Sequence, residues 1–343
     1  MSKGPAIAAD ADRDSRATRI EASAEIIGRI RLGEGGMLAE GAVVRSSRDN
    51  VEIGTGSAVL ENSVVIGTTT MPAIVGRRSV FGHRCMVVGA KIGDLCEIGN
   101  ASILMPGATL GDRVFLGEGT LVPAGVTLPS DVVAVGRPAR IVRRAADADL
   151  ERLRGLRGGD LSVPPATSIT IEPTTEAGAM GQLYPYRGIV PSIADSAVLF
   201  GSAEITGDVV VGERTIIGAG VKIIGDSHGP VRIGNDVQIL ENTVLHLLPD
   251  NQLILEDGVV IGPGSMIHGC HIGAGSVVEP GAIVCDGSAV GAGCVVRAGA
   301  VVKQRSTFGD GLDIDGFPAK EVGRIESPPA TPAWAFDRGD LPG

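Results

Sequence analysis

Two of the five histidines in this 343-residue chain stand close together in the stretch VVIGPGSMIHGCH, residues 259–271. His268 and His271 carry imidazoles, which can ligate a divalent metal, act as a base, or hydrogen-bond at a turn. Pro263 interrupts the stretch five residues before His268. The role of His268 therefore depends on the fold that presents it and on the side chains that this fold brings beside it.

An aliphatic residue recurs at every sixth position through much of the chain. The first such run is Val80, Met86, Ile92, Ile98, Leu104, Leu110, Leu116, Val122 and Leu128. Neither the 3.6-residue period of a helix nor the two-residue period of a strand produces this spacing alone. The run resembles the hexapeptide repeat of left-handed parallel β-helices, in which three hexapeptides make one triangular coil and the aliphatic residue points inward. This resemblance implies an all-β fold.

The second half of the chain repeats the first half at an offset of 180 residues. The six-residue run returns from Val260 to Phe308, LEN at 60–62 recurs at 240–242, and GRPAR at 136–140 recurs as GFPAK at 316–320. We therefore predict two left-handed parallel β-helix domains in tandem, each closed by a short helical or extended segment. The predicted limits are an N-terminal tail at 1–17, a first domain with a C-terminal helix at 18–157, a linker at 158–187, a second domain at 188–325 and a C-terminal tail at 326–343.

Composition argues against several kinds of partner. The net charge is −10 and no Lys/Arg cluster is present, so we expect no nucleic-acid binding. No apolar run has the length of a signal peptide or of a membrane span, so we expect a soluble, cytoplasmic protein without a membrane partner. The cysteines show no CxxC spacing, which indicates neither a disulfide framework nor a thiolate zinc site, and we expect them to be small buried residues.

Four landmarks of the second half stand in the order IGDSHGPVRIG, ILENTVLHLLPD, IGPGSMIHGCHIG and GFPAK. They resemble the ordered landmarks of the gamma-class carbonic anhydrases over essentially the whole second half, and the first half shows the same resemblance more weakly. The resemblance implies a homotrimer of β-helices with one zinc ion at each subunit interface. Two histidines from one wall and a third from the neighbouring subunit would hold the zinc, which acidifies a bound water so that hydroxide can attack carbon dioxide.

Carried over residue by residue, the resemblance divides these ligands between the two halves. His246 and His268 occupy the two wall positions of the second half, but Pro263 stands at the third position and cannot bind a metal. In the first half, His83 occupies the third position. The two wall positions of the first half hold apolar residues, Ile66 and Val88. We therefore predict one composite metal site, with His83 from the first domain and His246 and His268 from the second, for zinc or for another divalent metal such as iron or cobalt.

The family's arginine and aspartate are divided in the same way, as Arg45 and Asp226, and the resemblance implies that they meet across the same interface. Arg45 is also a candidate for holding an anionic substrate. The family's acidic position beside the metal is occupied by Glu61 and Glu241. Glu241 is a candidate for acid/base work or for orienting a ligand, and holding loop backbone is its alternative role. The family's glutamine is replaced by leucine in both halves, at Leu60 and Leu240, so the electrophile can be carbon dioxide or a larger electrophilic substrate.

Two other functions remain open. Hexapeptide β-helices also include acyltransferases that use an acyl thioester and a single histidine base between adjacent prisms, a part that His246 or His83 can play. The third possibility is a scaffold without chemistry. We expect the two domains to pack side by side as a pseudo-oligomer, within one chain or between chains, and a homo-oligomer is compatible with this. His228 and His271 are assigned to hydrogen bonds at corners.

Overall fold

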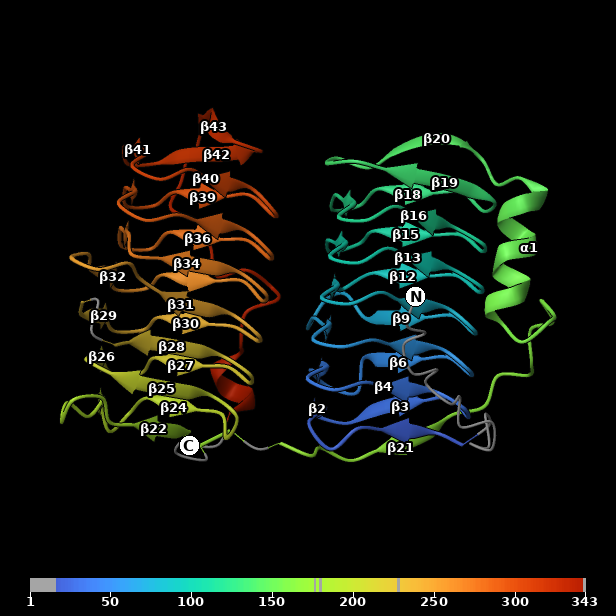
Figure 1. The fold of residues 1–343 in the computed structure, drawn as a ribbon, viewed down its shortest axis with the longest axis horizontal. Coiled ribbons are helices and arrows are strands. Elements are labelled where there is room, and N and C mark those ends of the chain that lie inside the picture. The colour runs from blue at the N-terminus through green and yellow to red at the C-terminus, as the bar shows by residue number, and fades with distance from the viewer. Residues whose placement is uncertain (1–16, 176, 179–180, 227–228, 342–343) are drawn as a thin grey trace, which may run out of the picture.

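In a computed structural model, the chain folds into two parallel β-helices that stand side by side (Figure 1). The structure describes residues 17–175, 177–178, 181–226 and 229–341. His228 and nearly all of the predicted N-terminal tail lie outside these ranges. The predicted all-β, hexapeptide-repeat β-helix fold is confirmed: in each half, neighbouring coils pair in parallel and build three flat walls.

The walls of the first domain are named A, B and C in chain order. Wall A contains β1 (Arg19–Ile20), β4 (Met37–Leu38), β7 (Ala58–Val59), β10 (Val80–Phe81), β13 (Glu97–Ile98), β16 (Phe115–Leu116), β19 (Val132–Val135) and the antiparallel β20 (Arg140–Arg144). Wall B contains β2 (Glu25–Ile27), β5 (Val43–Ser46), β8 (Val64–Gly67), β11 (Met86–Val88), β14 (Ile103–Leu104) and β17 (Leu121–Val122). Wall C contains β3 (Ile30–Leu32), β6 (Val51–Ile53), β9 (Ala73–Val75), β12 (Lys91–Ile92), β15 (Thr109–Leu110), β18 (Thr127–Leu128) and the antiparallel β21 (Ile169–Ile171).

The offset of 180 residues carries these walls onto walls A′, B′ and C′ of the second domain. Wall A′ contains β24 (Val198–Leu199), β27 (Ile216–Ile217), β30 (Gln238–Ile239), β33 (Val260–Ile261), β36 (Val277–Val278), β39 (Val295–Val296), β42 (Leu312–Gly316) and the antiparallel β43 (Ala319–Arg324). Wall B′ contains β22 (Gln182–Tyr184), β25 (Glu204–Gly207), β28 (Lys222–Gly225), β31 (Val244–His246), β34 (Met266–His268), β37 (Ile283–Val284) and β40 (Val301–Val302). Wall C′ contains β23 (Ser192–Ile193), β26 (Val209–Val211), β29 (Val231–Ile233), β32 (Leu253–Leu255), β35 (His271–Ile272), β38 (Ala289–Val290) and β41 (Thr307–Phe308).

Two segments outside the coils pack against them. Helix α1 (Asp147–Leu156) follows β20, buries Leu153 completely, and is joined to wall A by an ion pair between Arg157 and Glu97. The segment predicted as a linker, 158–187, contributes β21 to wall C and β22 to wall B′. The short 3-10 helix η1 (Arg338–Asp340) lies in the C-terminal tail. Within the described ranges, no helix is long and apolar enough to cross a bilayer.

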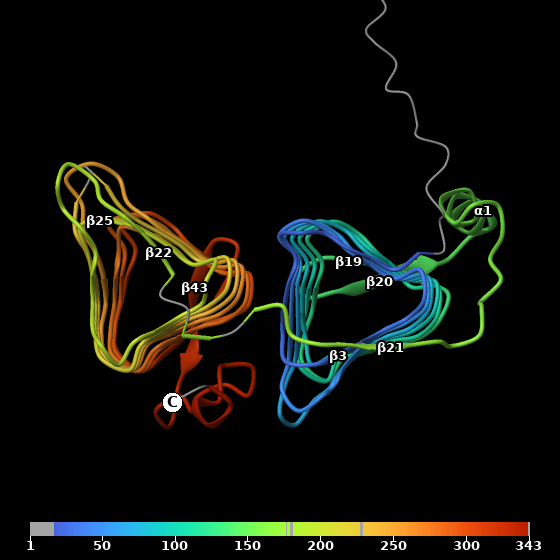
Figure 2. The same ribbon diagram turned by 90° about the horizontal axis from the view of Figure 1, so that it is seen from below.

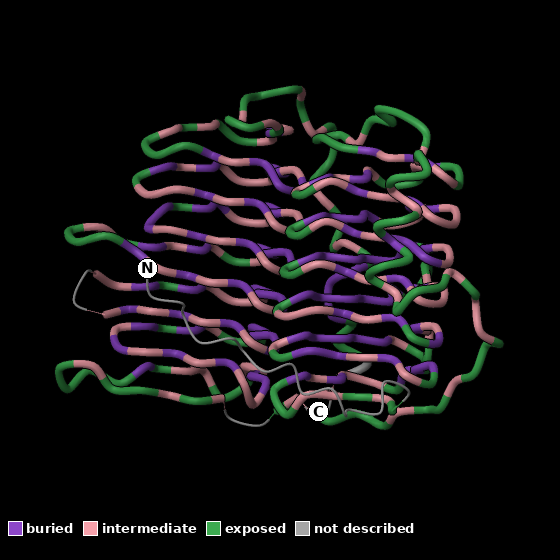
Figure 3. The backbone as a smooth tube through the Cα atoms, turned by 45° about the vertical axis from the view of Figure 1, so that its right-hand side comes forward, coloured by how far each residue is buried: buried purple, intermediate pink, exposed green. Residues whose placement is uncertain are grey.

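Each β-helix has its own interior of stacked aliphatic side chains, and Figure 3 shows the buried residues running along the strands of every coil. Two members of the six-residue run do not point inward. At β10 and β11 the inward residues are Phe81 and Val87, while Val80 and Met86 point outward. Successive residues of a strand point to opposite faces, so a shift of one residue moves the six-residue run from the outer to the inner face. The shift occurs between Met86, which points outward, and Ile92, which points inward. The cysteines are free; four are buried, and burial raises the pKa of the Cys85 thiol to about 12.

A third apolar cluster joins the two domains, and we call this contact the junction. It is built from outward residues of wall B and of wall A′: Val43, Val64, Ile66, Met86, Val88 and Ile103 on one side, and Ile216, Leu240, Val260, Val277 and Val295 on the other. Polar contacts flank it, such as Asn242 Nδ2 donating to the carbonyl of Gly41 at 2.9 Å. Gly264, in the turn after β33, has a φ of +65°, which favours glycine, and a Cβ there would lie 2.1 Å from Met86 Cε, so the Met86 side chain would have to move.

The C-terminal tail completes the junction. Trp334, Ala335 and Phe336 are buried in the same cluster. The backbone of Phe336 exchanges two hydrogen bonds with the side chain of Gln238 on wall A′, and its ring stacks on Phe200 with centroids 5.2 Å apart. Figure 2 shows the tail beside the second domain, in line with this packing.

Candidate functional site

The histidines of wall B′ lie on adjacent coils. His246 ends β31, His268 ends β34, and the two residues are paired in register. Their ring centroids are 5.9 Å apart and the rings are perpendicular. Both point outward and are half-buried, whereas the residues beside them, Leu245 and Ile267, fill the interior. Adjacent strands are ~4.8 Å apart, so two imidazoles in this register can reach one ion.

Asp286 lies behind His268. Nδ1 of His268 is buried without a hydrogen-bond partner, and the nearest carboxylate oxygen, Asp286 Oδ2, is 3.7 Å away. Asp286 is itself held by Asn251 Nδ2 and by the backbone N–H of Leu248, each at 3.3 Å. A proton on Nδ1 directed at this carboxylate leaves Nε2 as the metal-binding nitrogen, which is the usual arrangement of a ligating histidine.

His83 lies in the turn between β10 and β11, at the corner where walls A and B meet. Its Nδ1 is 2.9 Å from Asn100 Oδ1, an acceptor that fixes the proton on Nδ1. Its Nε2 is 3.0 Å from Glu61 Oε2, within ion-pair distance but not aligned as a hydrogen bond. The ring is thus oriented with Nε2 facing Glu61, whose carboxylate would stand beside a metal bound at this nitrogen.

Within one chain, the three histidines do not form the predicted composite site. Among the residues that the structure describes, no group of three or more His, Cys, Asp and Glu side chains is placed to hold a metal. The reason lies in which walls meet. The junction uses walls B and A′, whereas the histidine pair is on wall B′ and His83 is at the corner next to wall A.

The junction is instead the position at which both sets of ligands have been replaced. Ile66 and Val88, which stand where the wall histidines would be, are fully buried in it. Pro263 precedes Gly264 in the turn that touches Met86. An apolar contact therefore occupies the position at which the resemblance implies a metal site.

The predicted charged residues are divided between this junction and the outer walls. Arg45 does not meet Asp226, which directly follows β28 on wall B′. Its Nε instead donates to Glu241 Oε1 at 2.5 Å, its Nη2 donates to the carbonyl of Trp334 at 2.5 Å, and its guanidinium lies 4.2 Å from the ring centroid of Phe336. The side chain of Glu241 is completely buried and that of Arg45 is 4% exposed. Glu241 therefore lies inside the junction and ties the domains together.

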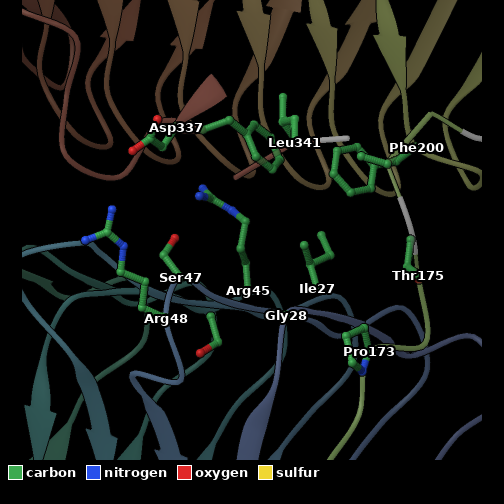
Figure 4. Close-up of a pocket in the computed structure, with 13 residues that line it drawn as sticks. Ile27, Gly28, Arg45, Ser47, Arg48, Pro173, Thr175, Phe200, Asp337 and Leu341 are labelled. Atoms are coloured by element: carbon green, nitrogen blue, oxygen red, sulfur yellow. The ribbon is translucent and has the colours of Figure 1, made fainter. Parts of the chain in front are cut away.

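A pocket of about 580 Å³ opens beside this ion pair (Figure 4). Arg45, Ser47 and Arg48 reach it from the first domain, and Phe200 and Asp337 reach it from the second domain and the tail. Sequence reasoning missed the tail that closes it. A signal was present: the only tryptophan, in AWAF at 333–336, stands in a chain with 3% aromatic residues.

Comparisons with known proteins agree with this fold. The sequence profile described as the hexapeptide repeat of succinyl-transferase matches residues 72–106, 252–285 and 268–304. A carbonic anhydrase of Geobacillus kaustophilus is 42% identical over 104 residues, which are 30% of this chain and 57% of that protein. The mitochondrial gamma carbonic anhydrase 2 of Arabidopsis thaliana is 26% identical over 134 residues, 37% of this chain and 48% of that protein. The chain spans about half the length of these curated relatives.

Transferases are among the similar proteins too. A solved structure of a hexapeptide transferase family protein from Anaplasma phagocytophilum is 30% identical in sequence, with a TM-score of 0.41. The match covers 42% of this chain and 84% of that one.

Proposed function

Because the chain is a hexapeptide-repeat protein with gamma-class carbonic anhydrase homologues, we propose that it is a metal-dependent enzyme of the carbonic anhydrase type. The observation that carries the proposal is the His246–His268 pair on wall B′, with its rings 5.9 Å apart. These two residues would supply two of the three ligands of a zinc ion. His83, oriented by Asn100, would supply the single ligand of a second ion. Each set is thus one part of a site that a facing β-helix completes.

The surroundings of His268 are compatible with a role as a metal ligand. Its Nδ1 is buried without a hydrogen-bond partner, and the nearest carboxylate oxygen, on Asp286, lies 3.7 Å away. With its proton on Nδ1 and directed at Asp286, His268 would keep Nε2 free to hold a metal. When bound, a zinc ion supplies a Lewis acid that acidifies a coordinated water.

The remaining residues that the resemblance singled out are assigned the following roles. Glu61 Oε2 stands 3.0 Å from Nε2 of His83, so this carboxylate would lie beside a metal bound there. Glu241 is paired with Arg45 and fully buried, so we assign it to holding the junction. Asp226 remains a candidate for contacts at wall B′. Leu240 is buried in the junction, and the substrate is proposed to be carbon dioxide or another small electrophile.

The test is metal content and carbon dioxide hydration of the full chain, purified from its own cells together with whatever it assembles with. We expect zinc to copurify and His268→Ala to remove it along with the hydration activity. The matched control is His271→Ala, on wall C′, where the ring is 48% exposed and contacts Glu256 at 2.7 Å. This variant is expected to keep both zinc and activity.

Two results would decide against the proposal. Zinc content that is unchanged in a His246→Ala/His268→Ala double variant would show that the metal is bound elsewhere. Consumption of an acyl thioester by metal-free protein would instead support the transferase function that relatives of this fold also carry.

A further inference from the structure

The pocket beside the ion pair of the junction has a charged end and an apolar end. In Figure 4, Arg48 and Asp337 lie at one end of the pocket, and Phe200 and Pro173 lie at the other. Arg48 belongs to the first domain and Asp337 to the C-terminal tail, so opposite sides of the pocket carry opposite charges. The volume of about 580 Å³ is in the range of sites that bind small organic molecules.

The positive charge at this end is not used by the chain itself. Within the described ranges, the guanidinium of Arg48 forms neither an ion pair nor a hydrogen bond. Asp49, its neighbour in sequence, is already paired with Arg29, whose Nη2 is 2.7 Å from Oδ2. Ser47 lines the same part of the pocket and adds a hydroxyl donor. Arg48 and Ser47 are therefore placed to bind a carboxylate.

The negative charge comes from Asp337, which reaches the pocket from the side of the tail (Figure 4). Its Oδ1 accepts the backbone N–H of Gly339 at 2.9 Å, and no ion pair neutralises it among the residues that the structure describes. The adjacent Arg338 is directed at Asp236 instead, at 3.3 Å. The Asp337 carboxylate can thus accept hydrogen bonds from an ammonium group in the pocket.

The other end of the pocket offers apolar contacts. The ring of Phe200 is completely buried and stacks on Phe336, with centroids 5.2 Å apart. Ile27 and Leu341 add aliphatic surface. Arg45 does not make this end cationic, because the buried ion pair of the junction neutralises its charge. An apolar side chain of a ligand would gain free energy here by leaving water.

We propose that this pocket binds a free apolar α-amino acid. The carboxylate of the ligand would bind Arg48 and Ser47, its ammonium group would bind Asp337, and its side chain would lie against Phe200 and Leu341. A ligand with one charge would leave the opposite charge of the pocket without a partner, whereas a zwitterion satisfies both. Because the tail forms one side of the pocket, binding would also stabilise the docked tail.

The test is titration of the full chain with L-phenylalanine, followed by calorimetry and by the fluorescence of Trp334. This residue is buried two positions before Phe336, which lines the pocket. We expect saturable one-to-one binding. Three analogues each remove one contact: phenylpropionate lacks the ammonium group, phenethylamine lacks the carboxylate and glycine lacks the apolar side chain. Each analogue is expected to bind at least about tenfold more weakly.

Two variants with matched controls test where the ligand binds. Arg48→Gln and Asp337→Asn are each expected to weaken binding of L-phenylalanine by at least about tenfold. Arg48→Gln should also bind L-phenylalanine no more tightly than phenethylamine, because the carboxylate has lost its partner. The controls are Arg305→Gln, at an exposed arginine with a positive φ like that of Arg48, and Asp310→Asn, at an exposed aspartate that accepts a backbone N–H. Neither control residue lines the pocket, so both variants should bind normally.

Three results would overturn the proposal: no saturable binding of L-phenylalanine, equally tight binding of phenylpropionate or phenethylamine, or binding that both pocket variants leave unchanged. Circular dichroism melting shows whether each variant is folded, and the analogue series on the unaltered chain decides the matter even where a variant unfolds. His83, His246 and His268 do not line the pocket, so removal of metal with a chelator should leave binding unchanged. Loss of binding on metal removal would place the ligand at the histidines instead.

Discussion

The ion pair between Arg45 and Glu241 provides a sharp test of how the junction holds the two domains together. Arg45→Met removes the cation and leaves the Glu241 carboxylate buried with no counter-charge, since its side chain is completely inaccessible and its Oε2 already lacks a hydrogen-bond partner. Removing one partner of a buried pair typically costs about 3–5 kcal/mol. The carbonyl of Trp334 also loses its charged donor, so the tail should loosen in the same step.

Trp334 is the natural probe for this effect. It is the only tryptophan, it is 4% exposed, and it belongs to the junction. Its fluorescence during urea unfolding therefore follows the opening of the junction. We expect the Arg45→Met variant to lose about 3–5 kcal/mol of the free energy of opening. The double variant Arg45→Met/Glu241→Leu should recover most of this loss, because an apolar pair of similar volume replaces a buried ion pair with little cost.

The control is an ion pair of similar length at the surface. Arg113 and Asp131 of the first domain are also 2.5 Å apart, but their side chains are 35% and 38% exposed. Arg113→Met is expected to leave the Trp334 transition unchanged, because solvent screens an exposed pair. If Arg45→Met shifts the transition no further than Arg113→Met, or if the double variant is as unstable as the single one, the pair does not hold the junction as described.

Two further predictions concern packing and pH. Gly264→Ala is expected to weaken the junction more than Gly275→Ala: both glycines have positive φ, but only the Cβ at 264 would displace the end of the Met86 side chain, and equal urea midpoints would contradict this. Asp149→Asn is expected to loosen α1 at pH 7, because the Arg143 hydrogen bond holds the pKa of the Asp149 carboxyl at about 2, below its usual 3.8. This contribution is present above the usual pKa and is lost as pH falls through about 2, so hydrogen exchange in α1, corrected for intrinsic rates, should differ at pH 7 and converge near pH 2.

The six-residue period predicted the fold because it repeats over many coils, but it did not fix which residue of each strand is inward. Val80 and Met86 lie in the run yet face outward, since the shorter step between β11 and β12 changes the phase. The period alone contains no signal for this, because apolar residues occupy both faces of these strands. The outward residues are apolar for another reason: Met86 packs in the junction.

The candidate site was predictable only in part. The resemblance assigns His246 and His268 to one wall of the second half, and the structure places these two residues in register. The sequence cannot indicate which walls meet, because walls B and B′ carry nearly the same outward apolar residues. The two walls differ mainly in having Ile66 and Val88 on one and the two histidines on the other. The assignment of Glu241 to the junction likewise depends on Arg45, whose position across the interface has no sequence signature.

One physical argument explains why apolar residues and proline stand at the junction while the histidines stand outside it. A metal site between two β-helices needs room for polar ligands and water, whereas a permanent contact inside one chain gains from dry packing. Covalent linkage makes the contact of wall B with wall A′ permanent, and there the ligands are replaced by Ile66, Val88 and Pro263. On wall B′, and at the corner between walls A and B, the chain keeps histidines that lie outside the two β-helix interiors. Restoring histidine at Ile66 and Val88 alone should therefore yield no metal site, because Pro263 still offers no third ligand, and the buried imidazoles would open the junction.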